Sequence, residues 1–183
     1  MAEVTRYFYD TEFNDDGTTI DLVSIGIVSD DGREYYAVSS EFDVERLRAR
    51  KWLLDNVWPY LPLTDRMGPE EDLNFSHPDV KPRSQIAAEV KDFLLSAQSP
   101  QLWAWYAAFD HVAYSQLFGK MIDIPVGLPW FTCDIKQEHV RLGCPELPEQ
   151  AADEHHALAD ARHNRVMFES LRAYEARHGG SRW

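Results

Sequence analysis

The sequence lacks any long run of apolar residues and contains only two cysteines. No stretch approaches the roughly 20 consecutive apolar residues that a membrane-spanning helix requires. Near the N-terminus, Glu3, Arg6 and Asp10 interrupt the apolar residues, so the segment is unlike a secretory signal peptide. Cys133 and Cys144 suit a reducing compartment, in which thiols stay free. We therefore expect a cytoplasmic protein that does not span a membrane.

Basic residues are also scarce, with 18 Lys and Arg against 31 Asp and Glu and a formal net charge of −13. This balance argues against a broad surface for nucleic acids, because affinity for phosphates comes from clustered Lys and Arg. The objection weakens if acidic residues hold divalent cations, which reverse the local sign of charge. The densest basic run is Arg46, Arg48, Arg50 and Lys51. It could bind a phosphate backbone, although a solvated helix face is the commoner role of such a run.

The composition that is present, 44% hydrophobic and 13% aromatic, is typical of a globular chain. The length of 183 residues fits one domain, 1–183. Apolar periodicity and turn signals predict the elements. The predicted strands are Thr5–Phe13, Thr19–Ser29, Glu34–Ser39, Gln101–Phe109 and Trp130–Thr132. The predicted helices are Val44–Asn56, Arg83–Ala97, Asp110–Gly119, Asp134–Leu142 and His156–Arg177, with an irregular excursion at 63–82.

The order of these elements predicts an α/β fold. Three strands come first, and Asp30–Gly32 is a tight hairpin signal between two of them. Later strands alternate with helices, which is typical of parallel pairing. We therefore expect a mixed sheet of about five strands, three antiparallel and then parallel, with helices on both faces.

The first candidate site residues are Asp10 and Glu12, near the end of the first predicted strand. Residues two apart in a strand project from the same face, so both carboxylates are presented side by side. Such a pair can hold a metal ion. Taken alone, the pattern more often marks only the end of a strand before a turn.

Two further acidic positions begin predicted helices. Asp110 follows an apolar strand, and ligands of α/β sheets collect at the carboxyl ends of strands, although Asp is also a common N-cap. Asp160 follows His155 and His156 at the start of the last helix. Together with Asp10 and Glu12 these residues form one ordered set along the chain.

This set resembles the DEDDh 3′-5′ exonucleases, the family of RNase T and oligoribonuclease. The matching residues are Asp10 and Glu12, Asp110 after Phe109, and the H-x-x-x-x-D spacing of His155 and Asp160. Within the family the chain is most similar to the RNase AS group of polyadenylate-specific 3′-exoribonucleases. That similarity lies in Arg6–Phe13, Gly32–Ser39, Leu102–Trp105 and Asp110–Ala113. The chain departs from the wider family at Tyr106, where Asn is usual.

The resemblance implies a ribonuclease-H-like fold and two-metal-ion catalysis. By analogy the four carboxylates hold two Mg²⁺ ions, for which Mn²⁺ can substitute, and His155 is the general base. Hard carboxylate oxygens suit these cations. The expected reaction removes nucleoside 5′-monophosphates from the 3′ end of single-stranded RNA, with a preference for poly(A) tails. Thr11 and Phe13 are the predicted substrate-binding residues, and relatives of this type suggest a homodimer.

Helix geometry and family spacing point to different histidines. On an uninterrupted helix His156 shares a face with Asp160, four residues later, whereas His155 does not. The family spacing favours His155, which requires His155 to lie on the loop before the helix. His163, one turn beyond Asp160, is expected on a solvated face.

Several alternatives stay open from the sequence. The chain could be a DNA-directed proofreading-type exonuclease, or a nucleic-acid-binding module that has lost its activity. Retention of all five positions argues against the second. A zinc site formed by Cys133, His139, Cys144 and a later His would have spacings unlike the usual paired motifs.

Overall fold

A mixed sheet forms the centre of the structure, a computed structural model that describes residues 4–64, 71–150 and 153–179. The described strands form one sheet of six, in the order β4-β3-β2-β1-β5-β6. The strands are β1 (Thr5–Asp15), β2 (Ile20–Ser29), β3 (Glu34–Ser39), β4 (Val80–Lys81), β5 (Pro100–Ala104) and β6 (Thr132–Asp134). Strands β1, β2 and β3 pair antiparallel, and the other pairings are parallel. This arrangement confirms the expected α/β class with a ribonuclease-H-like mixed sheet.

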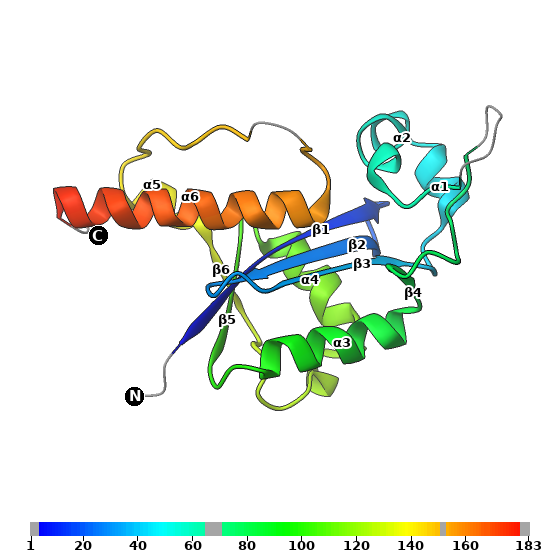
Figure 1. Cartoon of the computed structure of the whole chain (residues 1–183), viewed down its shortest axis with the longest axis horizontal. Coiled ribbons are helices and arrows are strands. Elements are labelled where there is room, and N and C mark those ends of the chain that lie inside the picture. The colour runs from blue at the N-terminus through cyan, green and yellow to red at the C-terminus, as the bar shows by residue number, and fades with distance from the viewer. Residues whose placement is uncertain (1–3, 65–70, 151–152, 180–183) are drawn as a thin grey trace.

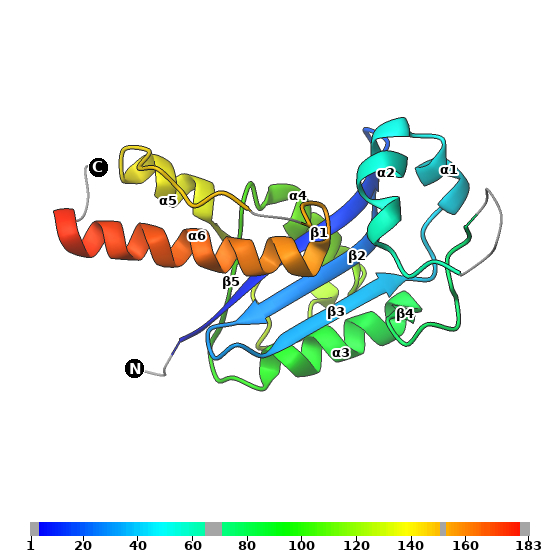
Figure 2. The ribbon, with the colours of Figure 1, turned by 45° about the horizontal axis from the view of Figure 1, so that its top comes forward.

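Helices cover both faces of the sheet (Figures 1 and 2). Helix α6 crosses one face, and α3 lies on the other. The α-helices are α1 (Val44–Arg48), α2 (Lys51–Asn56), α3 (Arg83–Leu95), α4 (Ala108–Gln116), α5 (Ile135–Arg141) and α6 (Ala157–His178). Two 3₁₀ turns, η1 (Trp58–Tyr60) and η2 (Met121–Asp123), complete the elements. None of the described helices combines the length and apolar character that a membrane crossing needs.

The alternation of β1 divides the core into two layers. Tyr7 and Tyr9 pack in one buried cluster with residues of α3 and α4. Phe8 packs in another, with Phe168 and Leu171 of α6. Because successive strand side chains point to opposite faces, Asp10 and Glu12 share the face of Phe8. Asp10 and Glu12 therefore face the side covered by α6.

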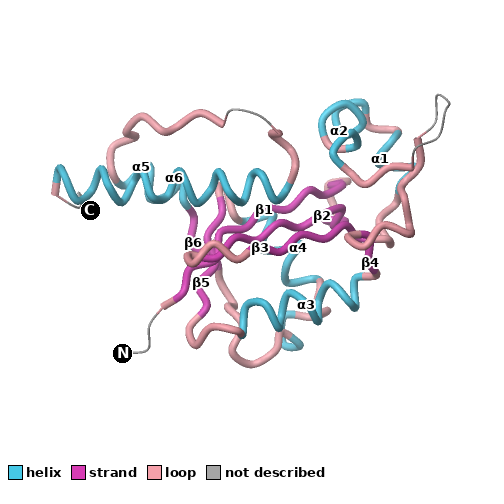
Figure 3. The backbone as a smooth tube through the Cα atoms, in the orientation of Figure 1, coloured by secondary structure: helices cyan, strands magenta, loops and turns pink. Residues whose placement is uncertain are grey.

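A third cluster joins α1, α2 and η1 to the sheet. Phe42, Leu47, Leu53 and Trp58 pack with residues of β2, β3 and β4. Figure 3 shows α1 and α2 together at the end of the sheet where β1 ends. Helices α1 and α2 thus border the end of the sheet at which the acidic residues of β1 lie.

Several predicted element bounds were wrong. The apolar run predicted as the strand Gln101–Phe109 ends as a strand at Ala104, because Tyr106 has a φ of 54° and turns the chain into α4. An apolar run does not distinguish a strand from the start of a buried helix. The helix predicted over Val44–Asn56 is divided into α1 and α2. The predicted irregular excursion contains the short parallel strand β4, and the last strand is Thr132–Asp134 rather than Trp130–Thr132.

Gly26 lets α6 approach the sheet at the level of Asp10, its partner in the β1–β2 register. A methyl group at Gly26 would overlap the backbone of Ala157 and Leu158, the first turn of α6. These atoms belong to a helix backbone, so no flexible side chain can move to make room. The close contact sets the position of the helix start that carries Asp160.

We expect Gly26→Ala to displace the start of α6. Overpacking of this kind costs about 2–3 kcal/mol, which corresponds to a melting temperature lower by about 5–10 °C in a chain of this size. Calorimetry or thermal fluorescence measures the change. The control is Gly17→Ala, where an added methyl group meets no atom within 4 Å and only the backbone φ of +85° opposes the substitution. Equal activity and stability losses in the two variants would contradict the steric argument.

Candidate active site

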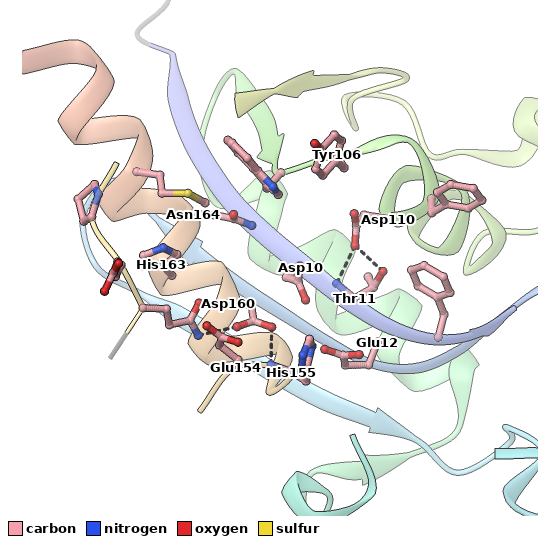
Figure 4. Close-up of a pocket in the computed structure, with 17 residues that line it drawn as sticks. Asp10, Thr11, Glu12, Tyr106, Asp110, Glu154, His155, Asp160, His163 and Asn164 are labelled. Atoms are coloured by element: carbon pink, nitrogen blue, oxygen red, sulfur yellow. Dashed lines mark hydrogen bonds between the residues drawn. The ribbon is translucent and has the colours of Figure 1, made fainter. Parts of the chain in front are cut away.

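The predicted acidic residues converge from three elements on one pocket (Figure 4). Asp10 and Glu12 come from β1, Asp110 from the first turn of α4, and Asp160 from the first turn of α6. The pocket has a volume of about 830 Å³. Its lining also includes Thr11, Phe13 and His155. All seven predicted site residues therefore line one cavity, while the roles assigned to them stay predictions.

The tightest group within the pocket combines Glu12, His155 and Asp160. One possible ligand atom from each lies within 4.8 Å of the others, and in the described part of the chain no other group of His, Cys, Asp and Glu is this close. Asp10 and Asp110 line the pocket beside this group. The structure thus brings a histidine as well as carboxylates to the place where a cation would bind.

Burial and mutual repulsion dominate the electrostatics of the carboxylates. Removal from water raises the pKa of Asp10 well above its ordinary value, and the negative charges of the other three carboxylates raise it further. The pKa of Glu12 is raised well above its usual value by burial and then by the charges of Asp160 and Asp110. Two unit charges about 4 Å apart interact by about 4 kcal/mol at an effective dielectric constant of 20. The cluster is therefore unfavourable when every member is ionised and no cation is bound.

The Asp110 carboxylate is held in place by Thr11. The backbone N–H of Thr11 donates to Oδ1 of Asp110 at 2.9 Å, and the Thr11 hydroxyl donates to the same oxygen at 2.7 Å. Burial raises the pKa of Asp110 to about 6, and the hydrogen bonds from Thr11 oppose this shift. The sequence did not indicate this contact. The hydroxyl of Thr11 is engaged with Asp110, and its predicted contact with substrate stays a prediction.

The Asp160 carboxylate also accepts two hydrogen bonds. The backbone N–H of His155 donates to Oδ2 at 2.9 Å, and Nε2 of Gln150 donates to Oδ1 at 2.6 Å. Burial raises the pKa of Asp160, and these two donors lower it. Gln150 precedes α6 on an irregular loop, so no periodic pattern in the sequence could have identified it.

The two adjacent histidines occupy different environments. His155 lies before α6 with a φ of 70° and lines the pocket. His156 is the N-cap of α6, its Nδ1 accepting from the backbone N–H of Ala159, and its ring stacks on Tyr36 with centroids 4.6 Å apart. His155 is therefore on the preceding loop, as the family spacing requires, and His156 is committed to the helix start.

Trp52 of α2 contacts the predicted catalytic histidine. Its ring meets the ring of His155 edge to face, with centroids 4.7 Å apart, although Trp52 is 55% exposed. The sequence could not have predicted this contact, because Trp52 is a single aromatic residue on a mostly polar helix face. His163, expected on a solvated face, also lines the pocket. This face of α6 therefore borders the cavity, and His163 is partly exposed there.

Aromatic rings border the acidic cluster. Phe13 and Phe109 stack on each other with centroids 6.0 Å apart and an interplanar angle of 23°, and both line the pocket. Single-stranded nucleic acids bind to such surfaces because every base has an aromatic face. The position of Phe13 therefore suits the predicted contact with a base.

Residues of the basic run that follows β3 form ion pairs with acidic residues of the same chain. Arg46 pairs with Asp16 and Asp21, and Arg48 pairs with Asp72. Lys51 pairs with Asp55. These ion pairs offset the positive charge, so the run favours a structural or solvated role over a phosphate-binding surface.

Divalent cations fit this donor set. The carboxylate oxygens are hard ligands of the kind that Mg²⁺ and Mn²⁺ prefer. Their shared negative charge, which raises the pKa of both Asp10 and Glu12, is the charge that bound cations would neutralise. The pocket can thus hold cations next to a histidine and to aromatic surfaces.

Known proteins are similar to this chain in sequence. The signature of the 3′-5′ exoribonuclease Rv2179c-like domain matches residues 68–171, which include Asp110, His155 and Asp160. The 3′-5′ exoribonuclease Rv2179c of Mycobacterium tuberculosis strain H37Rv is 47% identical over 159 residues, 86% of this chain and 87% of the relative. A 3′-5′ exoribonuclease of strain CDC 1551 matches with the same identity and coverage.

Proposed function

Since this chain belongs to the Rv2179c-like family of 3′-5′ exoribonucleases, we propose that it releases nucleotides from the 3′ end of RNA by two-metal-ion catalysis. The observation that carries the proposal is the convergence of Glu12, His155 and Asp160 in a pocket that Asp10 and Asp110 also line. This set and its order along the chain support membership of the DEDDh exonucleases and similarity to the RNase AS group.

The four carboxylates have the role of metal ligands in this proposal. Asp10, Glu12, Asp110 and Asp160 would hold two Mg²⁺ ions, or Mn²⁺ in their place. Such ions would lower the pKa of a bound water and would stabilise the negative charge on the transferring phosphoryl group. Thr11 keeps the carboxylate of Asp110 in one orientation through its two hydrogen bonds.

His155 is the proposed general base. One imidazole nitrogen takes a proton from the attacking water, whose oxygen forms a bond to the terminal phosphorus while the bond to the preceding 3′ oxygen breaks. The departing 3′ oxygen takes a proton from solvent, so the products are a nucleoside 5′-monophosphate and an RNA with a new 3′-hydroxyl. Histidine suits this step because its unperturbed pKa lies near neutrality. The edge contact with Trp52 and the backbone hydrogen bond to Asp160 restrict where the imidazole can lie.

Labelled RNA tests the reaction directly. The purified protein with Mg²⁺ should shorten 5′-labelled single-stranded RNA in single-nucleotide steps and release a labelled mononucleotide at once from 3′-labelled RNA. Excess EDTA should stop both reactions, and added Mg²⁺ or Mn²⁺ should restore them. A 5′-labelled substrate that loses its label first would contradict the direction, and turnover in EDTA would contradict the metal dependence.

The preference for adenylate is a separate part of the proposal. It is supported by the resemblance of Arg6–Phe13 and Gly32–Ser39 to polyadenylate-specific enzymes. Poly(A) should be hydrolysed at least about tenfold faster than poly(U) or poly(C), the discrimination that one or two pocket contacts provide. Equal rates on the three polymers would refute the preference and leave the exonuclease proposal intact.

RNA is proposed over DNA because both relatives are named exoribonucleases. Oligodeoxyadenylate in the same assay measures the alternative, a DNA-directed exonuclease. We also propose that the protein is a homodimer and is located in the cytoplasm. Light scattering coupled to gel filtration measures the oligomeric state. Retention of Asp10, Glu12, Asp110, His155 and Asp160 argues against an inactive binding module.

A further inference from the structure

Two consecutive aromatic residues, Trp105 and Tyr106, line the pocket beyond the acidic cluster. They follow β5, and their rings meet edge to face with centroids 5.4 Å apart. In the view of Figure 4, Tyr106 lies on the opposite side of Asp10 from His155. Tyr106 is 61% exposed. Packing of the core therefore does not account for its position.

The backbone of Tyr106 has a conformation that bulky residues rarely adopt. Its φ is 54°, in the left-handed region, and its carbonyl accepts a hydrogen bond from the N–H of Ala108 at 2.7 Å. This turn connects β5 to α4, and α4 places Asp110. Unfavourable backbone conformations cluster at ligand-binding sites, where the surrounding structure maintains them. The turn thus fixes the backbone of Tyr106 relative to the start of α4, which carries Asp110.

Lys136 lies beside these two rings, although it is not among the residues that line the pocket. Nζ of Lys136, on α5, lies 5.0 Å from the ring centroid of Trp105 and 5.9 Å from that of Tyr106. In the described ranges no carboxylate forms an ion pair with Lys136, unlike Arg46 and Arg48, and its Nζ lies at hydrogen-bond distance, 3.4 Å, from Nδ1 of His139. Its charge is therefore not neutralised locally, in a chain whose net charge is −13.

An exposed aromatic face beside a lysine that no described carboxylate neutralises is a combination that can bind single-stranded nucleic acid. Bases stack on aromatic rings, and a lysine pairs with the phosphate. The pocket volume of about 830 Å³ lies towards the upper end of the range for small-ligand sites, about 300–1,000 Å³. The cavity can therefore accommodate more than a terminal nucleotide near Phe13 and Phe109.

We propose that Tyr106 and Lys136 form a second nucleotide subsite, which binds the nucleotide on the 5′ side of the scissile phosphate. The base stacks on the ring of Tyr106, and the phosphate of that nucleotide pairs with Nζ of Lys136. Trp105 supports both groups through its ring contacts. The inference rests on the proposed function, and it gives the enzyme a contact with RNA upstream of the bond that is cut.

Binding without turnover tests the subsite first. Fluorescence anisotropy with a labelled oligoadenylate of about eight nucleotides, in an Asp10→Asn background, measures affinity. Tyr106→Ala should weaken binding about 5- to 100-fold, the range for loss of one base stack, and Tyr106→Phe should retain it. Lys136→Gln should lower the slope of log affinity against log salt by about 0.7, the value for one phosphate of a single strand.

Matched controls come from exposed residues outside the pocket lining. Phe131→Ala removes an aromatic ring that is 65% exposed, and Lys91→Gln removes a cation whose side chain is 43% exposed. Neither should change affinity or salt dependence. Tyr106→Leu, which keeps apolar volume without an aromatic face, should bind as weakly as Tyr106→Ala and guards against a folding defect in the smaller variant.

A substrate without an upstream nucleotide separates the two proposals. A nucleoside 5′-phosphate p-nitrophenyl ester contains only the terminal nucleotide. Tyr106→Ala and Lys136→Gln should cleave it at the wild-type rate, while their KM for oligoadenylate rises. Wild-type protein inactive on both substrates would contradict the proposed function. Active wild-type protein with variants unchanged on RNA, or impaired equally on both substrates, would overturn the subsite.

Discussion

Asp10→Asn is expected to abolish turnover and at the same time to stabilise the metal-free protein. Loss of one metal ligand removes several kcal/mol of transition-state stabilisation, a fall of about a thousandfold in rate. Asparagine has nearly the same shape but no charge, so it relieves the repulsion from the other three carboxylates. A gain of about 1–2 kcal/mol would raise the metal-free melting temperature by about 3–6 °C.

Thermal melting with and without Mg²⁺ measures both parts of this expectation. Wild-type protein should melt at a higher temperature when Mg²⁺ is added, and Asp10→Asn should lose most of that increase. Asp92→Asn is the control, because its side chain is 79% exposed and lies outside the pocket lining. An active Asp10→Asn variant, or one that is less stable without metal, would contradict the proposed arrangement of charge.

The pH dependence of the metal-free protein has a definite sign. Asp10 and Asp110 have folded-state pKa values raised above their unfolded values, to about 6 for Asp110. Such groups favour the folded state at pH below their unfolded pKa, and this contribution is lost as pH rises through the folded pKa. The metal-free melting temperature should therefore fall across about pH 4–6, and Mg²⁺ should reduce that fall.

His155→Ala is expected to reduce turnover by about 10²–10⁴-fold while leaving Mg²⁺ binding largely intact. This range is what a general base typically contributes. Because His155 has a φ of 70°, His155→Asn is a second variant, since asparagine tolerates the left-handed region better than alanine. Both variants should retain the melting-temperature increase with Mg²⁺. The rate of RNA shortening at saturating Mg²⁺ measures the effect.

His156→Ala is the matched comparison for this prediction. It removes the N-cap of α6 and the stack on Tyr36, so it should destabilise the protein by about 0.5–2 kcal/mol. Below its melting temperature its turnover should stay near the wild-type value. An inactive His156→Ala together with an active His155→Ala would reverse the assignment of the general base.

The local sequence alone determined the pairing of Asp10 with Glu12. Two residues apart on a strand, they share a face whatever the rest of the chain does. Strand alternation likewise places Tyr7 and Tyr9 in one layer of the core and Phe8 in the other. The order of strands and helices predicted the α/β class, since each element depends mainly on its own periodicity. The spacing of the four carboxylates and His155 then predicted the family through its resemblance to known exonucleases.

Tertiary structure alone decided which side chains meet across elements. The hydrogen bonds from Thr11 to Asp110 join residues 99 positions apart, and the contact of Trp52 with His155 joins two distant elements. The left-handed turn at Tyr106, which ended a predicted strand early, depends on how α4 packs. The different surroundings of His155, on the loop, and His156, at the N-cap of α6, depend on where α6 begins. Spacing cannot encode such contacts, because they depend on the relative placement of whole elements, which packing of the assembled core determines.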